Sequence, residues 1–134
     1  MPVGILEKER LAPGKLTTHE FIGESPKGKH IILYDDMIDT GGTIIAGVEA
    51  LRKRGAKEVY IYATHGIFSP TSDSSAEEKF RNAGIPVVVT GSIPRASEYQ
   101  KKHSSWLTIL PIEDLLATVL KESDRYGGSV SALF

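Results

Sequence analysis

A chain of 134 residues with 40% hydrophobic content is long enough to form one domain with a buried core. Its 16 basic and 17 acidic residues leave a net charge of −1, which gives no electrostatic reason to expect nucleic acid or an anionic membrane as a partner. The chain has no cysteine, no apolar run long enough for a membrane span and no secretory pattern, so we expect a cytoplasmic protein.

The first part of the chain predicts two strands. Residues 1–6 (MPVGIL) form a short apolar run, and a strand there would place Lys8 and Arg10 just past its end. Residues 16–22 alternate and are rich in threonine, which predicts a strand at the edge of a sheet. The cluster GESPKGK at residues 23–29 predicts a turn.

Residues 30–43, HIILYDDMIDTGGT, predict a strand, a turn and the start of a helix. Residues 31–34 favour a buried strand that runs into the adjacent carboxylates Asp35 and Asp36. A third acid, Asp39, precedes a Gly-Gly turn. The helix that follows ends at a glycine and has one apolar face, which consists of Ile44, Val48 and Leu51.

The rest of the chain alternates strands and helices through short links. Strands are predicted at residues 58–64, 85–90 and 106–110. A helix is predicted to open at the capping-box pattern Ser74-Ser75-Ala76-Glu77 and to end before Gly84. Two more are predicted, over a polar segment ending near His103 and over 112–126. The last helix carries an apolar stripe of Ile112, Leu115, Leu116, Val119 and Leu120. This alternation predicts an α/β fold with a mainly parallel, doubly wound sheet in a single domain, residues 1–134.

The Gly-Gly turn is predicted to bind a phosphate group. Glycines allow a close approach of the backbone, and amide groups at a helix N-terminus attract anions. Thr40 and Thr43 add hydroxyl donors. The carboxylates of Asp35 and Asp36 would repel an anion, unless they face sugar hydroxyl groups or a metal ion. The pattern therefore favours a phosphorylated sugar as ligand.

Two other interpretations of this turn stay open. An acidic pair at a strand end also occurs in receiver-type domains, which bind Mg²⁺ and accept a phosphoryl group. The Gly-Gly turn could also be only a tight connection. The sequence contains neither GxxxxGK[ST] nor GxGxxG, so the common nucleotide-binding loops are not indicated.

Basic residues and histidines outside the turn give weaker signals. Lys8 and Arg10 could clamp a polyphosphate, although their local pattern favours ordinary surface charges. The four histidines lack metal-ligand spacing. His65 ends a predicted parallel strand, where ligands bind, but a structural or hydrogen-bonding role is favoured. No nucleophile elbow is present.

Several motifs together resemble one enzyme family. The run YDDMIDTGGT resembles the phosphoribosyl pyrophosphate (PRPP) binding loop of ribose-phosphate diphosphokinases, the enzymes that make PRPP. LEKER resembles their basic strand-end motif, with Glu9 where a second basic residue is usual. EALRKRGAKEVYIYATHGIFS and the ending SVSALF also resemble this family. The similarity extends over residues 3–134 and is weaker over 70–83 and 91–105.

The resemblance implies a type I phosphoribosyltransferase-like sheet and the transfer of a diphosphoryl group from Mg²⁺-ATP to the C1 hydroxyl of ribose 5-phosphate. It assigns the 5-phosphate to Asp39, Thr40, Gly41, Gly42 and Thr43, and the ribose hydroxyl groups to Asp35 and Asp36. It makes Lys8 the catalytic lysine, and Arg10 a residue that binds the phosphates and stabilises the migrating group. Ser129 and Ser131 match tail positions that help form a regulatory phosphate or ADP site between subunits.

The resemblance covers only the C-terminal one of the two similar domains of these enzymes. The other domain carries most of the ATP site and the protein ligands of Mg²⁺, so we expect Mg²⁺ to arrive with ATP or PRPP. The chain alone should bind ribose 5-phosphate or PRPP but be a poor kinase, and its expected partners are further copies of itself or a missing N-terminal domain. Two alternatives are a non-catalytic subunit of a PRPP synthetase and, with less support, a salvage phosphoribosyltransferase.

Overall fold

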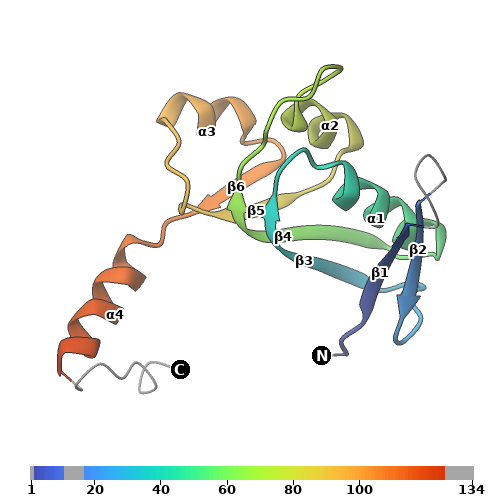
Figure 1. Cartoon of the computed structure of the whole chain (residues 1–134), viewed down its shortest axis with the longest axis horizontal. Coiled ribbons are helices and arrows are strands. Elements are labelled where there is room, and N and C mark those ends of the chain that lie inside the picture. The colour runs from blue at the N-terminus through green and yellow to red at the C-terminus, as the bar shows by residue number, and fades with distance from the viewer. Residues whose placement is uncertain (1, 11–16, 126–134) are drawn as a thin grey trace.

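The computed structural model describes residues 2–10 and 17–125, and for residues 7–10 and 17–20 it describes the backbone alone. Its elements are β1 (Ile5–Arg10), β2 (Thr17–Ile22), β3 (His30–Ile38), α1 (Gly42–Lys53), β4 (Glu58–Gly66), α2 (Ala76–Ala83), β5 (Val87–Thr90), α3 (Ser97–His103), β6 (Leu107–Leu110) and α4 (Glu113–Arg125). Strands β3 to β6 form a four-stranded parallel sheet in the order β3-β4-β5-β6 (Figure 1). The predicted α/β fold with a parallel sheet is confirmed.

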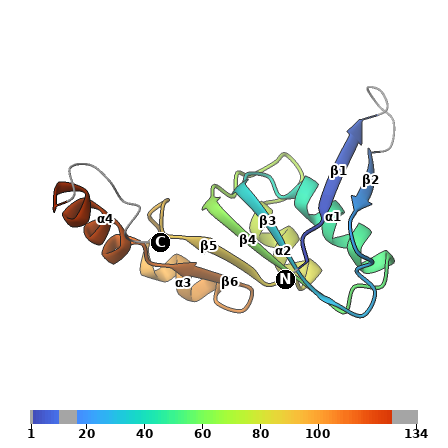
Figure 2. The ribbon, with the colours of Figure 1, turned by 90° about the horizontal axis from the view of Figure 1, so that it is seen from below.

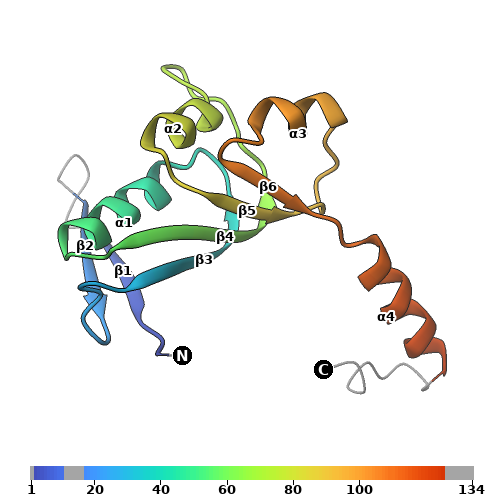
Figure 3. The same cartoon turned by 180° about the vertical axis from the view of Figure 1, so that it is seen from behind.

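One face of the sheet forms the hydrophobic core. Helices α1, α2 and α3 all lie on this side (Figures 1 and 3). Alternate residues of β4 and β5 point towards them and are at most 2% exposed, namely Val59, Ile61, Ala63, Val87 and Val89. Helix α1 contributes its predicted apolar face, in which Ile44, Val48 and Leu51 are all buried.

A cluster of aromatic rings packs α2 against the residues that follow β4 and precede β6. The fully buried ring of Phe80, in α2, stacks on Trp106 with 5.7 Å between ring centroids. Phe68 meets both of these rings edge-on, at 6.2 and 5.8 Å. Burial of rings of this size dominates the energetics of small cores, so this end of the domain is firmly packed.

The other face of the sheet carries exposed apolar side chains. Ile32 and Tyr34 are 61% and 66% exposed, so the predicted buried strand at residues 31–34 is covered on one side only. The physical reason is that α1 to α3 all lie on one side of the sheet, so only one face of β3 meets these helices. None of the described helices is long and apolar enough to cross a membrane.

Helix α4 lies on the opposite side of the sheet from α1 to α3, and projects beyond the β6 edge (Figures 1 and 3). None of its residues is buried, and Leu115, Leu116 and Leu120 of its predicted apolar stripe are more than half exposed. Figure 2 shows α4 and the β1–β2 pair at opposite ends of the sheet. The predicted helix is therefore present, but its apolar stripe contacts no core among the described residues.

Strands β1 and β2 form a separate antiparallel pair. The first strand was predicted over residues 1–6 with Lys8 and Arg10 at its end, whereas β1 begins at Ile5 and continues to Arg10. Lys8 is paired with His19 and Arg10 with Thr17 in the register of the two strands. This pairing extends β1 through its charged residues, which an apolar pattern alone could not indicate.

The capping box of α2 is one residue later than predicted. Ser75, not Ser74, is the N-cap residue, and its Oγ accepts a hydrogen bond from the backbone N–H of Glu78 at 3.2 Å. The carboxylate of Glu78 accepts in turn from the backbone N–H of Ser75 at 3.3 Å. The sequence Ser74-Ser75-Ala76-Glu77-Glu78 allows both registers, and the structure selects the second.

Candidate functional site

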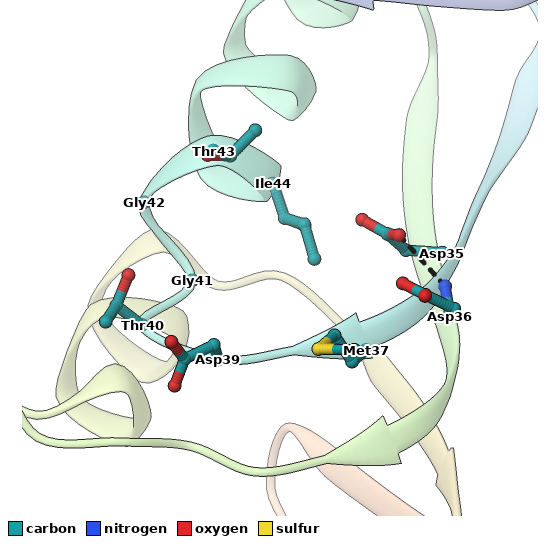
Figure 4. Close-up of a pocket in the computed structure, with 9 residues that line it drawn as sticks. All are labelled: Asp35, Asp36, Met37, Asp39, Thr40, Gly41, Gly42, Thr43 and Ile44. Carbon is teal, nitrogen blue, oxygen red and sulfur yellow. Dashed lines mark hydrogen bonds between the residues drawn. The ribbon is translucent and has the colours of Figure 1, made fainter.

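A pocket of about 330 Å³ lies where β3 passes into α1 (Figure 4). Its wall consists of Asp35, Asp36, Met37, Asp39, Thr40, Gly41, Gly42, Thr43 and Ile44. This volume lies near the lower end of the range of about 300–1,000 Å³ that is usual for small-molecule sites. Every residue that the sequence assigned to the phosphate and to the ribose hydroxyl groups thus lies around one pocket at the C-terminal end of a parallel strand.

Gly41 gives the turn its shape. Its φ of 75° lies in the left-handed region, and a Cβ atom there would lie only 2.7 Å from Cε2 of Phe80. The carbonyl of Gly41 accepts the backbone N–H of Ile45 at 3.0 Å, the first hydrogen bond of the helix. The turn therefore rests directly on the buried aromatic cluster, which fixes the direction in which α1 leaves the pocket.

The N-terminal end of α1 provides the electropositive side of the pocket. The first backbone N–H groups of any helix lack acceptors within the helix, and the helix dipole adds partial positive charge at this end. Here the N-cap residue Gly41 supplies no side-chain acceptor, and the first turn of α1 contains no acidic residue. Gly42 and Thr43 are exposed at this end of the helix. The arrangement suits an anion such as phosphate.

Two carboxylates provide the opposite side. In Figure 4, Asp35 and Asp36 lie together on β3, across the pocket from Thr40 and Gly41. The backbone N–H of Asp36 donates to Oδ1 of Asp35 at 2.9 Å. Partial burial is the main reason why the pKa of Asp35 is raised; this N–H opposes the shift, and the carboxyl group of Asp36 adds to it. Both side chains offer hydrogen-bond acceptors to the uncharged part of a ligand.

The structure does not show the remaining predicted site residues, Lys8, Arg10, Ser129 and Ser131, at the pocket. Lys8 and Arg10 lie in β1, and their side chains are outside the described part of the chain. The earlier residue Leu6 lies beside Gly47 of α1, where a Cβ atom would meet its Cδ2 at 2.8 Å. Strand β1 thus begins against the helix that borders the pocket. Ser129 and Ser131 lie outside the described residues.

A second polar group at the ends of β4 and β5 was missed in the sequence. Nδ1 of His65 lies 2.8 Å from Oγ of Ser92, and the hydroxyl groups of Ser92 and Thr90 both donate to the carbonyl of Thr64. The sequence favoured a structural or hydrogen-bonding role for His65, which agrees with this contact, but it did not single out Ser92. The available signal was position, because both residues follow strands predicted to be parallel neighbours.

Arg95 is a further residue that the sequence did not single out. Its Nη2 donates to the carbonyls of Gly66 and Ile67, at 2.9 and 2.6 Å. The guanidinium group lies over the ring of Tyr99, 4.8 Å from its centroid. Burial is the main reason why the pKa of Tyr99 is raised, and its hydroxyl donates to Glu77. Arg95 thus ties the loop after β4 to α3.

The fold and the pocket define a class of protein, namely a parallel α/β domain with a pocket at a glycine turn between a strand and a helix. Residues 14–134 match the family model described as "Phosphoribosyl synthetase-associated domain". The chain belongs to this family.

Curated proteins and a solved structure agree with the family assignment. The ribose-phosphate pyrophosphokinase of Mycobacterium leprae is 37% identical over 136 residues, which cover 100% of this chain and 39% of that protein. A protein of the same name from a strain of Prochlorococcus marinus is 42% identical and covers 99% and 38%, respectively. The chain thus spans about two fifths of the length of these relatives.

The structural comparison is with a crystal structure of phosphoribosylpyrophosphate synthetase from Mycobacterium smegmatis. It matches with a TM-score of 0.67 and 38% sequence identity, over 81% of this chain and 34% of that chain. The predicted type I phosphoribosyltransferase-like fold is confirmed by this match together with the parallel sheet.

Proposed function

We propose that this chain binds ribose 5-phosphate and PRPP in the pocket between β3 and α1, as the C-terminal part of a ribose-phosphate diphosphokinase. One observation carries the proposal: a single pocket has a helix N-terminus on one side and two adjacent carboxylates on the other. A phosphorylated sugar matches this division, because its phosphate needs donors and its hydroxyl groups need acceptors. The names of the relatives support the same substrate.

The proposed reaction is diphosphoryl transfer from ATP. The C1 hydroxyl of ribose 5-phosphate attacks the β-phosphorus of ATP and releases its proton to solvent, and the bond between the α–β bridging oxygen and that phosphorus breaks. PRPP forms, and AMP leaves. Residues 39–43 would hold the 5-phosphate, while Asp35 and Asp36 would accept hydrogen bonds from the ribose. Lys8 and Arg10 would stabilise the charge on the migrating group, because catalysis of phosphoryl transfer rests mainly on positioning and electrostatics.

Mg²⁺ is proposed to enter with ATP or PRPP. Among the described residues, there is no group of three or more histidine, aspartate or glutamate side chains that could hold a metal ion. Asp35 and Asp36 fit a cation that the ligand phosphates already bind, because Mg²⁺ in nucleotide sites usually takes one or two carboxylates and keeps several waters. Mg²⁺ would supply neutralisation of phosphate charge.

A titration of the chain with ribose 5-phosphate in a calorimeter tests the proposal. We expect ribose 5-phosphate and PRPP to bind at the same single site, so that each ligand displaces the other. Free ribose should bind far more weakly, because it lacks the phosphate that the end of α1 would hold. The absence of any heat of binding for both phosphorylated sugars at millimolar concentration would contradict the proposal.

A second candidate function is a non-catalytic subunit that assembles with an active enzyme in the cytoplasm. The observation in its favour is that the matching family model is described as a domain associated with phosphoribosyl synthetase. A coupled assay of AMP release separates the two. We expect negligible PRPP synthesis by this chain alone, and synthesis after addition of a protein that supplies the ATP site. No synthesis in either case, with ribose 5-phosphate still bound, would favour the subunit. Ser129 and Ser131 would then be tested for binding of phosphate or ADP between subunits.

A further inference from the structure

The side chain of Lys79 connects α2 to the turn that borders the pocket. Its Nζ donates to the carbonyl of Thr40 at 3.4 Å and to Oγ1 of Thr71 at 3.3 Å. Thr71 is itself held in place, because its hydroxyl donates to the carbonyl of Ser74 at 2.6 Å. Lys79 is half-buried. Its ammonium group is therefore fixed between the turn after β3 and the loop after β4.

The contact with Lys79 sets the direction of one amide group of the turn. No peptide bond among the described residues is cis, and in a planar trans peptide the C=O and the following N–H point in opposite directions. Because the carbonyl of Thr40 is directed to Lys79, the N–H of Gly41 is directed away from α2. Gly41 lines the pocket, and its N–H donates to no acceptor among the described residues. This N–H is therefore available to a ligand in the pocket.

Lys79 also places a positive charge behind the turn. It forms no ion pair with any carboxylate in the described part of the chain. An anion bound to the N–H of Gly41 would lie one peptide group and two hydrogen bonds away from Nζ, at about 8 Å. This separation is shorter than the Debye length of about 10 Å at 0.1 M salt, so the two charges attract each other at low ionic strength and are screened at high ionic strength.

We propose that Lys79 is a positioning residue for the 5-phosphate, which acts through the peptide group between Thr40 and Gly41 and through its own charge, without contacting the ligand. The choice of ligand rests on the proposed function above. The orientation of the peptide group does not, because it follows from contacts within the chain.

The orientation is tested first, without any ligand. Triple-resonance NMR of the full chain gives the ¹³C signal of the Thr40 carbonyl and the ¹⁵N signal of Gly41, which both respond to a hydrogen bond at that carbonyl. We expect both signals to move in Lys79→Met. They should stay unchanged in Arg81→Met, the matched control, because Arg81 is an exposed cation of α2 whose side chain makes no hydrogen bond to the turn. Unchanged signals in Lys79→Met would overturn the proposal.

Calorimetric titration with ribose 5-phosphate tests the effect on binding at two salt concentrations, about 0.01 M and about 1 M, where the Debye length is about 30 Å and about 3 Å. We expect Lys79→Met to bind about tenfold more weakly at low salt and about threefold more weakly at high salt, where only the lost orientation remains. Inorganic phosphate should show the same two ratios, because Lys79 acts on the phosphate and not on the sugar.

A conservative variant and the control separate this role from packing. Lys79→Arg keeps the charge and the donors, so its affinity for ribose 5-phosphate should lie within about twofold of the wild-type value. Arg81→Met removes the same charge from α2 and should also stay within about twofold at both salt concentrations. A thermal melt of each variant shows whether it is folded, and Lys79→Gln, which is uncharged and shorter, replaces Lys79→Met if that variant is not.

The failures of the two proposals can be told apart. A wild-type chain that binds neither ribose 5-phosphate nor PRPP contradicts the proposed function. Wild-type binding with equal affinity in Lys79→Met overturns the role of Lys79 and leaves the proposed function intact. A loss of affinity that is equal at both salt concentrations and is not restored in Lys79→Arg would indicate a packing role only, and would also overturn the proposal.

Discussion

Replacing Gly42 by valine is expected to abolish binding of ribose 5-phosphate while leaving the domain folded. A Cβ atom at this position meets nothing within 4 Å, and the residue begins α1. Valine in a helix is at least as favourable as glycine, so the free energy of unfolding should change by less than about 1 kcal/mol. The added isopropyl group would occupy the space that the phosphate needs in order to reach the amide groups of the turn.

The expected loss of affinity is large, because several hydrogen bonds to one charged group would be lost together. Each such bond contributes about 1.5–3 kcal/mol, so two of them correspond to a loss of about a hundredfold or more. Gly42→Ala provides the graded control, with a smaller loss and the same stability. Calorimetric titration and urea denaturation of both variants check this result. Undiminished binding by a folded Gly42→Val chain would exclude the turn as the phosphate site.

Replacing the neighbouring Gly41 by alanine is expected to lower the stability of the fold strongly, unlike the replacement of Gly42. The residue has a positive φ of 75°, and the new Cβ atom would lie 2.7 and 2.9 Å from two atoms of the Phe80 ring. The backbone strain costs about 1 kcal/mol, and overpacking against a buried ring costs about 1–3 kcal/mol. We expect urea denaturation to show a free energy of unfolding lower by about 2–4 kcal/mol.

Gly28 offers a matched control for the backbone part of this cost. Its φ is 73°, and a Cβ atom there has no neighbour within 4 Å. Gly28→Ala should therefore cost only about 1 kcal/mol. The double variant Gly41→Ala with Phe80→Leu should lose less stability than the sum of the two single variants, because the smaller side chain removes the clash. Equal losses for Gly28→Ala and Gly41→Ala would show that Phe80 does not support the turn.

The sequence predicted well what is encoded locally. The turn at residues 39–43 depends on two glycines, neighbouring acids and the start of an apolar helix, all within one stretch of chain. Periodicity likewise predicted α1 with its buried face of Ile44, Val48 and Leu51. Short apolar runs predicted β5 and β6, although both begin one or two residues later than expected.

Features that depend on long-range pairing could not be predicted in the same way. Which face of a strand the helices cover is a property of the whole fold, so the exposed side of Ile32 and Tyr34 was not foreseen. The extension of β1 to Arg10 depends on its partner β2. The contact between His65 and Ser92 joins residues 27 positions apart, and neither residue type is informative without the other.

An NMR titration tests most directly whether the 5-phosphate of a ribose binds to the turn after β3. Ribose 5-phosphate is added to the ¹⁵N-labelled chain, and the backbone amide signals are followed. We expect the largest shifts at Thr40, Gly41, Gly42 and Thr43, and smaller shifts at Asp35 and Asp36. Saturable shifts that are confined to other parts of the chain, with the amides of the turn unchanged, would contradict binding at the turn.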